Sequence, residues 1–182
     1  MTSSRALDSS LQRELEDLES VFADVLVAVF GEESEVIATG TEPDEAVLGG
    51  AAALLAVHDE SDDTYLGVHL RVSSELARRL AGRMLACAEP TREDLLEAVG
   101  AFGSIAAGKV MTLLVPAARL SLPSATLDEV GLPPAEEGSA APTVLRARVL
   151  GELAELALVP HVEAGGLAWP APQHSEVLET QP

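Results

Sequence analysis

The stretch from Thr91 to Leu114 constrains this chain most, because it joins a helical pattern of apolar residues to three internal glycines. Gly100, Gly103 and Gly108 each cost a helix about 1 kcal/mol relative to alanine. Small residues let another backbone approach closely, so the predicted helix has one apolar side and one nearly bare side. Either a neighbouring element packs on the bare side, or a partner docks there. The apolar side is formed by Leu95, Val99, Phe102, Ala106, Val110 and Leu113.

Two more helices are predicted from the same spacing of apolar residues. The first covers residues 7–30 and stops before Gly31, a residue type common just after the last helical turn. The second starts near Glu75, after two serines that can cap it. Thr91 followed by Asp94 is a variant of the capping box with Asp in place of Glu. This pair predicts where the glycine-containing helix begins.

Between the helices, short apolar runs and runs of alternating apolar and polar residues predict strands. Gly151 and Glu152 lie between the last two runs like a two-residue hairpin turn. The order of elements predicts an α/β layered (α+β) fold, in which a mostly antiparallel sheet has long helices packed on one face. We expect one domain over 1–162 and a disordered tail over 163–182. The predicted strands cover residues 36–38, 51–57, 65–72, 119–122, 144–150 and 153–159.

The composition narrows the choice of partners. The 182 residues carry a formal net charge of −19, and Lys109 is the only lysine, which argues against a nucleic-acid or anionic-membrane surface. Cys87 is the only cysteine, so neither an internal disulfide nor a cysteine-based zinc cage can form. We find no run of the roughly 18 apolar residues that a membrane span needs and no apolar signal core. We therefore expect a cytoplasmic protein without a membrane partner.

The sequence has no recognisable metal-binding or phosphate-binding motif. The histidines at 58, 69, 161 and 174 lack the spacing of a metal-binding motif, and we expect them to be structural or solvated. The glycines before Lys109 do not have the spacing of a phosphate-binding loop, and they lie inside a predicted helix instead of after a strand. The three glycines therefore need another explanation.

One segment of the glycine-containing helix resembles the signature of a known family. It reads Ala101-Phe-Gly-Ser104-Ile-Ala-Ala-Gly108-Lys109-Val110 and lines up without gaps on E-I-G-N-I-G-A-G-N-A of the CheC/CheX/FliY chemotaxis phosphatases. Residues 65–84 look like the family's strand and short helix before the motif helix, and residues 120–123 look like the strand and proline after it. The resemblance covers about residues 15–160 and is strongest to CheX, which carries one motif copy instead of two. It implies a CheX-like fold.

Members of that family hydrolyse the phospho-aspartate of response regulators such as CheY. Their motif helix presents an acidic or seryl residue, then Glu four residues on, then Asn three residues after that. The resemblance implies that the Asn orients the attacking water and that the Glu pairs with the regulator's active-site lysine. In this chain the three positions hold Glu97, Ala101 and Ser104. Alanine can form no salt bridge, and serine lacks the amide of Asn, so the motif is degenerate.

The resemblance also implies partners. A CheY-like receiver domain would dock on the helix face that carries Glu97, Ala101, Ser104 and Gly108, and any Mg²⁺ would belong to that receiver. We expect no cofactor and no metal site in this chain itself. CheX-type proteins pair as homodimers through sheet edges, and the predicted hairpin at 144–159 offers such an edge.

The residues at the signature positions, Glu97, Ala101 and Ser104, are compatible with three functions. The first is a non-catalytic module, a pseudoenzyme, that binds a receiver domain or a family relative. The second is a divergent phosphatase with Ser104 and Glu97 as catalytic residues, in which Ser104 holds the water and Glu97 reaches the receiver's lysine. The third is a ligand-binding or scaffold role outside phosphotransfer. Removing one positioning group typically lowers a rate about 10²- to 10³-fold, so the loss of two favours the first function.

Overall fold

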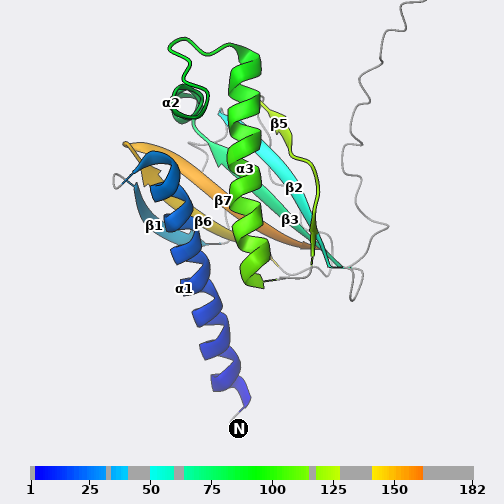
Figure 1. Ribbon diagram of the computed structural model, residues 1–182. Coiled ribbons are helices and arrows are strands. Elements are labelled where there is room, and N and C mark those ends of the chain that lie inside the picture. The colour runs from blue at the N-terminus through cyan, green and yellow to red at the C-terminus, as the bar shows by residue number, and fades with distance from the viewer. Residues whose placement is uncertain are drawn as a thin grey trace, which may run out of the picture.

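In the part of the chain that the structure describes, three helices cover one face of an antiparallel sheet (Figure 1). The helices are α1 (Ser3–Phe30), α2 (Ser74–Met84) and α3 (Arg92–Leu114). The strands are β1 (Ser34–Gly40), β2 (Ala51–Asp59), β3 (Thr64–Val72), β4 (Arg119–Leu120), β5 (Ser124–Thr126), β6 (Thr143–Val149) and β7 (Glu152–His161). This arrangement confirms the predicted layered α+β fold. The computed structural model describes residues 3–31, 34–40, 50–59, 64–114, 118–127 and 141–161.

The strand order across the sheet is β1-β6-β7-β3-β2-β4, and β5 pairs with a separate part of β2. Both strands of the predicted hairpin at 144–159 lie inside the sheet, because β6 also pairs with β1 and β7 also pairs with β3. The expectation that this hairpin offers a free edge is therefore wrong. Among the described strands, β1 lies at one side of the sheet, and β4 and β5 lie at the other.

The turn between β6 and β7 comes one residue earlier than predicted. Val149 pairs with Glu152, so Leu150 and Gly151 form the two-residue turn. Both have a positive φ, 53° at Leu150 and 85° at Gly151, as a type I′ hairpin turn requires. Glycine adopts this conformation freely, whereas leucine adopts it only at a cost, so Gly151 sets the position of the turn.

The segment after α3 forms two short strands instead of the single predicted strand at 119–122. β4 ends at Leu120, although Ser121 still forms two hydrogen bonds with Ala56. The Ser121 N–H donates to the Ala56 carbonyl oxygen at 2.9 Å, and the Ala56 N–H donates to Ser121 Oγ at 2.9 Å. Pro123 then interrupts the pairing, since proline has no N–H to donate. β5 follows and pairs with residues 52–54 of β2. Nothing in its three residues predicts a strand, so the pairing with β2 creates it.

The predicted starts of α2 and α3 are confirmed by their caps. The Ser73 hydroxyl oxygen accepts from the Leu76 N–H at 3.2 Å at the start of α2. At the start of α3, the Thr91 N–H and O–H donate to Asp94 Oδ2 at 2.8 and 2.7 Å. The Asp94 N–H donates back to Thr91 Oγ1 at 3.3 Å, which completes the capping box. The Thr91 backbone N–H and then its hydroxyl hold the pKa of the Asp94 carboxyl below its usual value of 3.8.

The core lies between the helices and the sheet and is aliphatic apart from three phenylalanines. Phe30 of α1 and Phe102 of α3 meet edge to face, with ring centroids 5.8 Å apart, and Phe22 of α1 is also fully buried. α1 begins at Ser3, earlier than the predicted residue 7, and its N-terminal part extends beyond the sheet (Figure 1). The phenylalanines therefore fix the C-terminal half of α1 against α3.

The opposite face of the sheet holds a row of charges that local sequence patterns do not predict. Arg71 of β3, Glu155 of β7 and Arg146 of β6 are neighbours in the register of three adjacent strands. Arg71 Nη1 donates to Glu155 Oε1 at 2.7 Å, and Arg146 Nε donates to Glu155 Oε2 at 3.3 Å. The side chains of Arg71 and Glu155 are 3% and 0% exposed. Because a buried charge is tolerated only when paired, this row ties the three strands to one register.

The predicted tail at 163–182 lies outside the described residues. The domain boundary at 162 therefore stays a prediction. The described part of the chain places α3 in front of β2, and α3 carries the residues that the sequence singles out (Figure 1).

Candidate functional site

The smallest residues of α3 decide how closely it approaches the sheet. At Gly103, a Cβ atom would lie 2.6 Å from the Cβ of Ala53 and 3.1 Å from Cδ1 of Leu55, both on β2. Only glycine allows this approach without a shift of the neighbours. At Gly100, a Cβ would meet Pro123 at an ordinary 3.6 Å. Close packing therefore explains one of the three glycines in full, and it does not require the glycine at 100.

The predicted site residues share the side of α3 that faces away from the sheet. Glu97 is exposed, and Ala101, Ser104 and Gly108 are partly exposed. Their spacing of four, three and four residues is that of one helical face. At Gly108, no atom lies within 4 Å of the place that a Cβ would take. All four positions are accessible to a partner, and their role in binding stays a prediction.

The hydroxyl of Ser104 is turned toward the helix backbone. It donates to the carbonyl oxygen of Gly100 at 3.0 Å, and Thr112 makes the same bond to Gly108 at 2.8 Å. Such bonds to the carbonyl four residues earlier are common for serine and threonine in helices. With its proton on the backbone, Ser104 offers a water molecule only an acceptor. An asparagine amide offers both a donor and an acceptor, so Ser104 is a weak substitute for a water-positioning group.

Glu97 and Ser104 lie far apart along the helix. They are seven positions apart, which is about 10 Å along the axis of an α-helix. Ala101 stands between them and has no polar side-chain atom. Catalytic groups that act on one phosphoryl group must come within hydrogen-bond reach of the same reacting atoms. The two candidate catalytic residues therefore do not form a ready-made pair.

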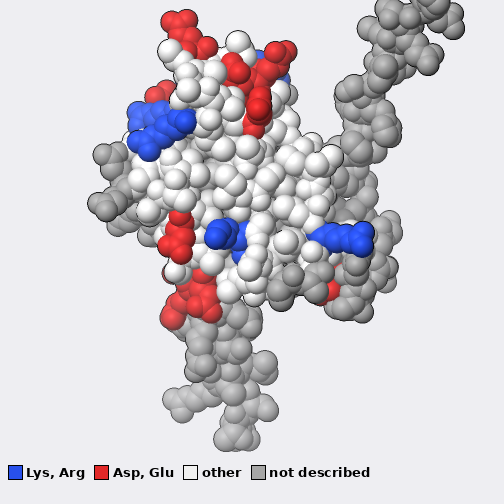
Figure 2. All heavy atoms as spheres, viewed as in Figure 1, with Lys and Arg blue, Asp and Glu red and all other residues white. Residues whose placement is uncertain are grey.

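The surface around this face is apolar and free of acidic groups at its centre. Figure 2 shows acidic side chains at the upper end and near the lower margin of this view, and between them a mainly white region that includes some basic side chains. Ile105 and Leu113 of α3 are 41% and 36% exposed, and Leu122 after β4 is 89% exposed. Exposed apolar patches with polar rims are typical of protein-binding surfaces.

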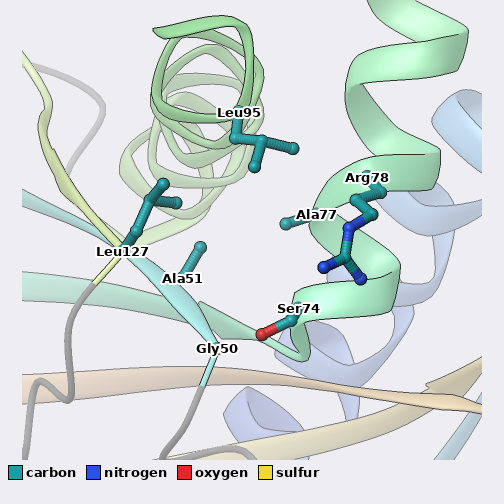
Figure 3. A pocket seen from close by; sticks show the side chains of 7 residues that line it. All are labelled: Gly50, Ala51, Ser74, Ala77, Arg78, Leu95 and Leu127. Atoms are coloured by element: carbon teal, nitrogen blue, oxygen red, sulfur yellow. The ribbon is translucent and has the colours of Figure 1, made fainter. Parts of the chain in front are cut away.

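A pocket of about 170 Å³ lies between α2, α3 and the start of β2 (Figure 3). Only two of its side chains are polar, Ser74 and Arg78 of α2, and α3 contributes Leu95. None of the predicted site residues lines it. Its volume is below the range of about 300–1,000 Å³ that is usual for sites of drug-sized ligands. The lining residues are Gly50, Ala51, Ser74, Ala77, Arg78, Leu95 and Leu127.

The placement of the described side chains also bears on whether the chain could bind a metal ion. In the described part of the chain, no group of three or more His, Cys, Asp or Glu side chains is placed to hold a metal ion.

α3 is long and apolar enough to cross a membrane by length and composition, although no membrane span was expected from the sequence. The core helix of a globular fold has the same properties, and α3 buries its apolar side against the sheet, α1 and α2.

No model of a known protein family matches the sequence, and no curated protein matches it. Solved structures nevertheless share the fold, and they are CheX and CheC-like chemotaxis proteins. The chain therefore has the CheX-like fold that the motif and its flanking segments predicted.

CheX of Vibrio vulnificus superposes with a TM-score of 0.66 at 13% identity, covering 82% of this chain and 99% of that one. The complex of CheX, CheY, BeF3 and Mg²⁺ from Borrelia burgdorferi contains a chain with a TM-score of 0.64 at 16% identity, covering 81% of this chain and 97% of that one. A complex of FliM and SpeE from Helicobacter pylori contains a chain with a TM-score of 0.60 at 8% identity, covering 89% and 91%. The shared architecture thus extends over nearly the whole of each counterpart.

Proposed function

We propose that this protein is a CheX-like module of bacterial chemotaxis or two-component signalling that binds a response-regulator receiver domain, or a family relative, without catalysis. The observation that carries the proposal is the accessible face of α3, where Ala101 and Ser104 stand at the two catalytic positions of the family signature. One structural counterpart comes from a complex of CheX with CheY, BeF3 and Mg²⁺, which supports a CheY-like partner for this chain.

The chemistry of the reaction explains why this face would bind without hydrolysing. An acyl phosphate is already reactive, so a phosphatase mainly has to position a water in line with the phosphorus. Ala101 has no group that can pair with the receiver's lysine, and the Ser104 hydroxyl donates to the Gly100 carbonyl at 3.0 Å. No cofactor of this chain takes part, and the Mg²⁺ belongs to the receiver. Docking would therefore leave the aspartyl phosphate in place.

A divergent CheY-type phosphatase is the second candidate, because Ser104 and Glu97 both lie on the accessible side of α3. For this function, Ser104 would have to release the Gly100 carbonyl and hold the water. Glu97 would have to reach the receiver's lysine from one turn before the position of Ala101.

A dephosphorylation assay separates the two candidates. The protein is mixed with a phosphorylated receiver domain from the same organism, and phosphate release is followed; binding is measured by calorimetry on the BeF3-activated receiver. We expect binding without acceleration. Acceleration that is lost in both Ser104→Ala and Glu97→Ala would establish the phosphatase. Absence of binding to every receiver of the organism would exclude both candidates.

A gain-of-function variant tests the alignment itself. Ala101→Glu together with Ser104→Asn restores both groups of the signature, and we expect dephosphorylation at least about tenfold faster than with the unmodified protein, since each such group is worth about 10²-fold. Ala101→Glu with Ser104→Ala is the matched control, because it adds the carboxylate without the amide. A folded double variant that binds the receiver and stays inert would show that α3 is misaligned with the signature.

The proposal includes a cytoplasmic location, where receiver domains act, and a homodimer that forms through a sheet edge. Since the hairpin at 144–159 lies inside the sheet, the edges left for this pairing among the described strands are β1 and the β4–β5 side. Light scattering of the purified protein tests the dimer.

A further inference from the structure

A stripe beside the motif face carries the only lysine of the chain. Lys109 is exposed, and it forms no ion pair with any described residue. Ile105, one turn before it, and Leu113, one turn after it, are 41% and 36% exposed. Residues four apart are neighbours on a helix surface, so these three side chains form one continuous strip, which we call the Lys109 stripe.

The Lys109 stripe is turned from the motif face toward α1. Phe102 and Lys109 are seven residues apart, so their directions around the helix differ by only about 20°. Phe102 meets Phe30 of α1, which places α1 on this side of α3. A partner that covers Ala101 and Ser104 and extends toward α1 therefore also covers the stripe.

The signature shows how the charge of this helix has changed. Position 101 is Glu in the signature and alanine here, and position 109 is Asn in the signature and lysine here. Over about two turns, the surface of α3 is therefore more positive by two charges. The rest of the chain is strongly acidic, with a net charge of −19. Lys109 therefore places a positive charge on this helix, in a chain whose net charge repels an acidic partner.

We propose that the Lys109 stripe is a second contact for the receiver domain, which meets it with an apolar surface and a carboxylate opposite Lys109; this inference rests on the proposed function. A receiver holds Mg²⁺ through carboxylates, so its docking side is acidic and would be repelled by this chain without a local cation. Apolar neighbours on both sides of Lys109 exclude water and strengthen such an ion pair. A second copy of the chain is disfavoured as the occupant, because the proposed homodimer pairs through a sheet edge, β1 or the β4–β5 side, and not through α3.

Charge reversal tests the carboxylate. Binding of the receiver is measured by calorimetry with and without BeF3 for the unmodified protein, Lys109→Glu, Lys109→Arg and Arg78→Glu. Arg78→Glu is the matched control, because it changes the net charge equally on α2, where the Arg78 side chain is 60% exposed. Reversing the charge opposite a carboxylate should weaken binding about tenfold, whereas the arginine variant and the control should stay within about twofold. The loss should be the same with and without BeF3, because the stripe lies beside the motif face and would meet a carboxylate other than those that hold Mg²⁺.

Leu113→Ser tests the apolar part of the stripe, and we expect binding to weaken about three- to tenfold. If the unmodified protein binds and Lys109→Glu binds equally well, the inference is wrong and the proposed function stands. If the Lys109→Glu variant lost binding only to the BeF3-activated receiver, Lys109 would contact the phosphoryl group, and the inferred ion pair with a carboxylate would be wrong. A loss of self-association instead of receiver binding, seen by light scattering, would assign the stripe to a second copy and overturn the inference. Failure of the unmodified protein to bind any receiver overturns the proposed function first.

Discussion

Gly103 and Gly108 lie five residues apart on the same helix, and their surroundings are opposite. Gly103 faces β2, where a Cβ would lie 2.6 Å from that of Ala53. Gly108 faces outward, where no atom lies within 4 Å of such a Cβ. The sequence presents both as the same helix-weakening residue. One glycine is therefore needed for packing, whereas the other leaves a surface bare.

The carboxylates of the molecule divide in the same way. Glu155 is fully buried between Arg71 and Arg146, whereas Glu97 is exposed on α3. A buried charge depends on its partners, and an exposed charge is stabilised by water. Substitutions at buried and at exposed positions should therefore differ in their effect on stability.

Glu155→Gln should be the most damaging change. It removes the negative charge between two arginines, and breaking a buried ion pair from one side costs about 3–5 kcal/mol. Glu97→Gln, the matched change on the exposed face, should stay within about 0.5 kcal/mol. Urea unfolding followed by circular dichroism measures both free energies of unfolding. Equal values for the two variants would show that the row on the sheet contributes nothing.

Gly103→Ala should destabilise the fold although alanine is the better helix former. The new Cβ would lie 2.6 Å from the Cβ of Ala53, and overpacking of this kind costs about 1–3 kcal/mol. Ala53→Gly removes the opposing Cβ, so the double variant should lose less stability than the sum of the two single variants. Purely additive losses in thermal unfolding would contradict the close contact between α3 and β2.

Gly108→Ala should stabilise the protein. The position is open, so the change gains helix propensity of up to about 1 kcal/mol without a clash. The midpoint of thermal unfolding should rise. The same variant places a methyl group on the proposed docking face, so calorimetry with the receiver should show equal or weaker binding. A fall in stability would mean that α3 is packed on this side as well.

The start of α3 should respond to acid. Hydrogen bonds from Thr91 lower the pKa of Asp94, so the ionised carboxylate stabilises the folded state at pH values above the unfolded-state value of 3.8. This stability is lost as the pH falls through the lowered pKa. Unfolding of the unmodified protein and of Asp94→Asn should therefore differ at neutral pH and converge in acid. A difference that persists below the lowered pKa would show that the carboxylate charge is not the cause.

The sequence predicts most of the elements correctly where the signal is local. The capping pair Thr91 and Asp94, the N-cap Ser73 and the stop at Gly31 are confirmed, because each acts within one helical turn. β5 and the position of Leu150 in the hairpin turn escape prediction, since both depend on pairing with a neighbouring strand. For the site, the sequence identifies the helix and the substituted positions Ala101 and Ser104. It does not show the bond of the Ser104 hydroxyl to Gly100 or the strip around Lys109.

The order of elements, the helix caps, the acidic charge and the two replaced residues of the signature are properties of the chain itself, because each follows from residue types at short separations. Only the tertiary structure decides that the 144–159 hairpin lies inside the sheet and that Arg71, Arg146 and Glu155 share one row. It also decides which glycine of α3 is enclosed and which is open. The physical reason is that strand partners and close approaches join residues far apart in the sequence, where local spacing carries no information about distance.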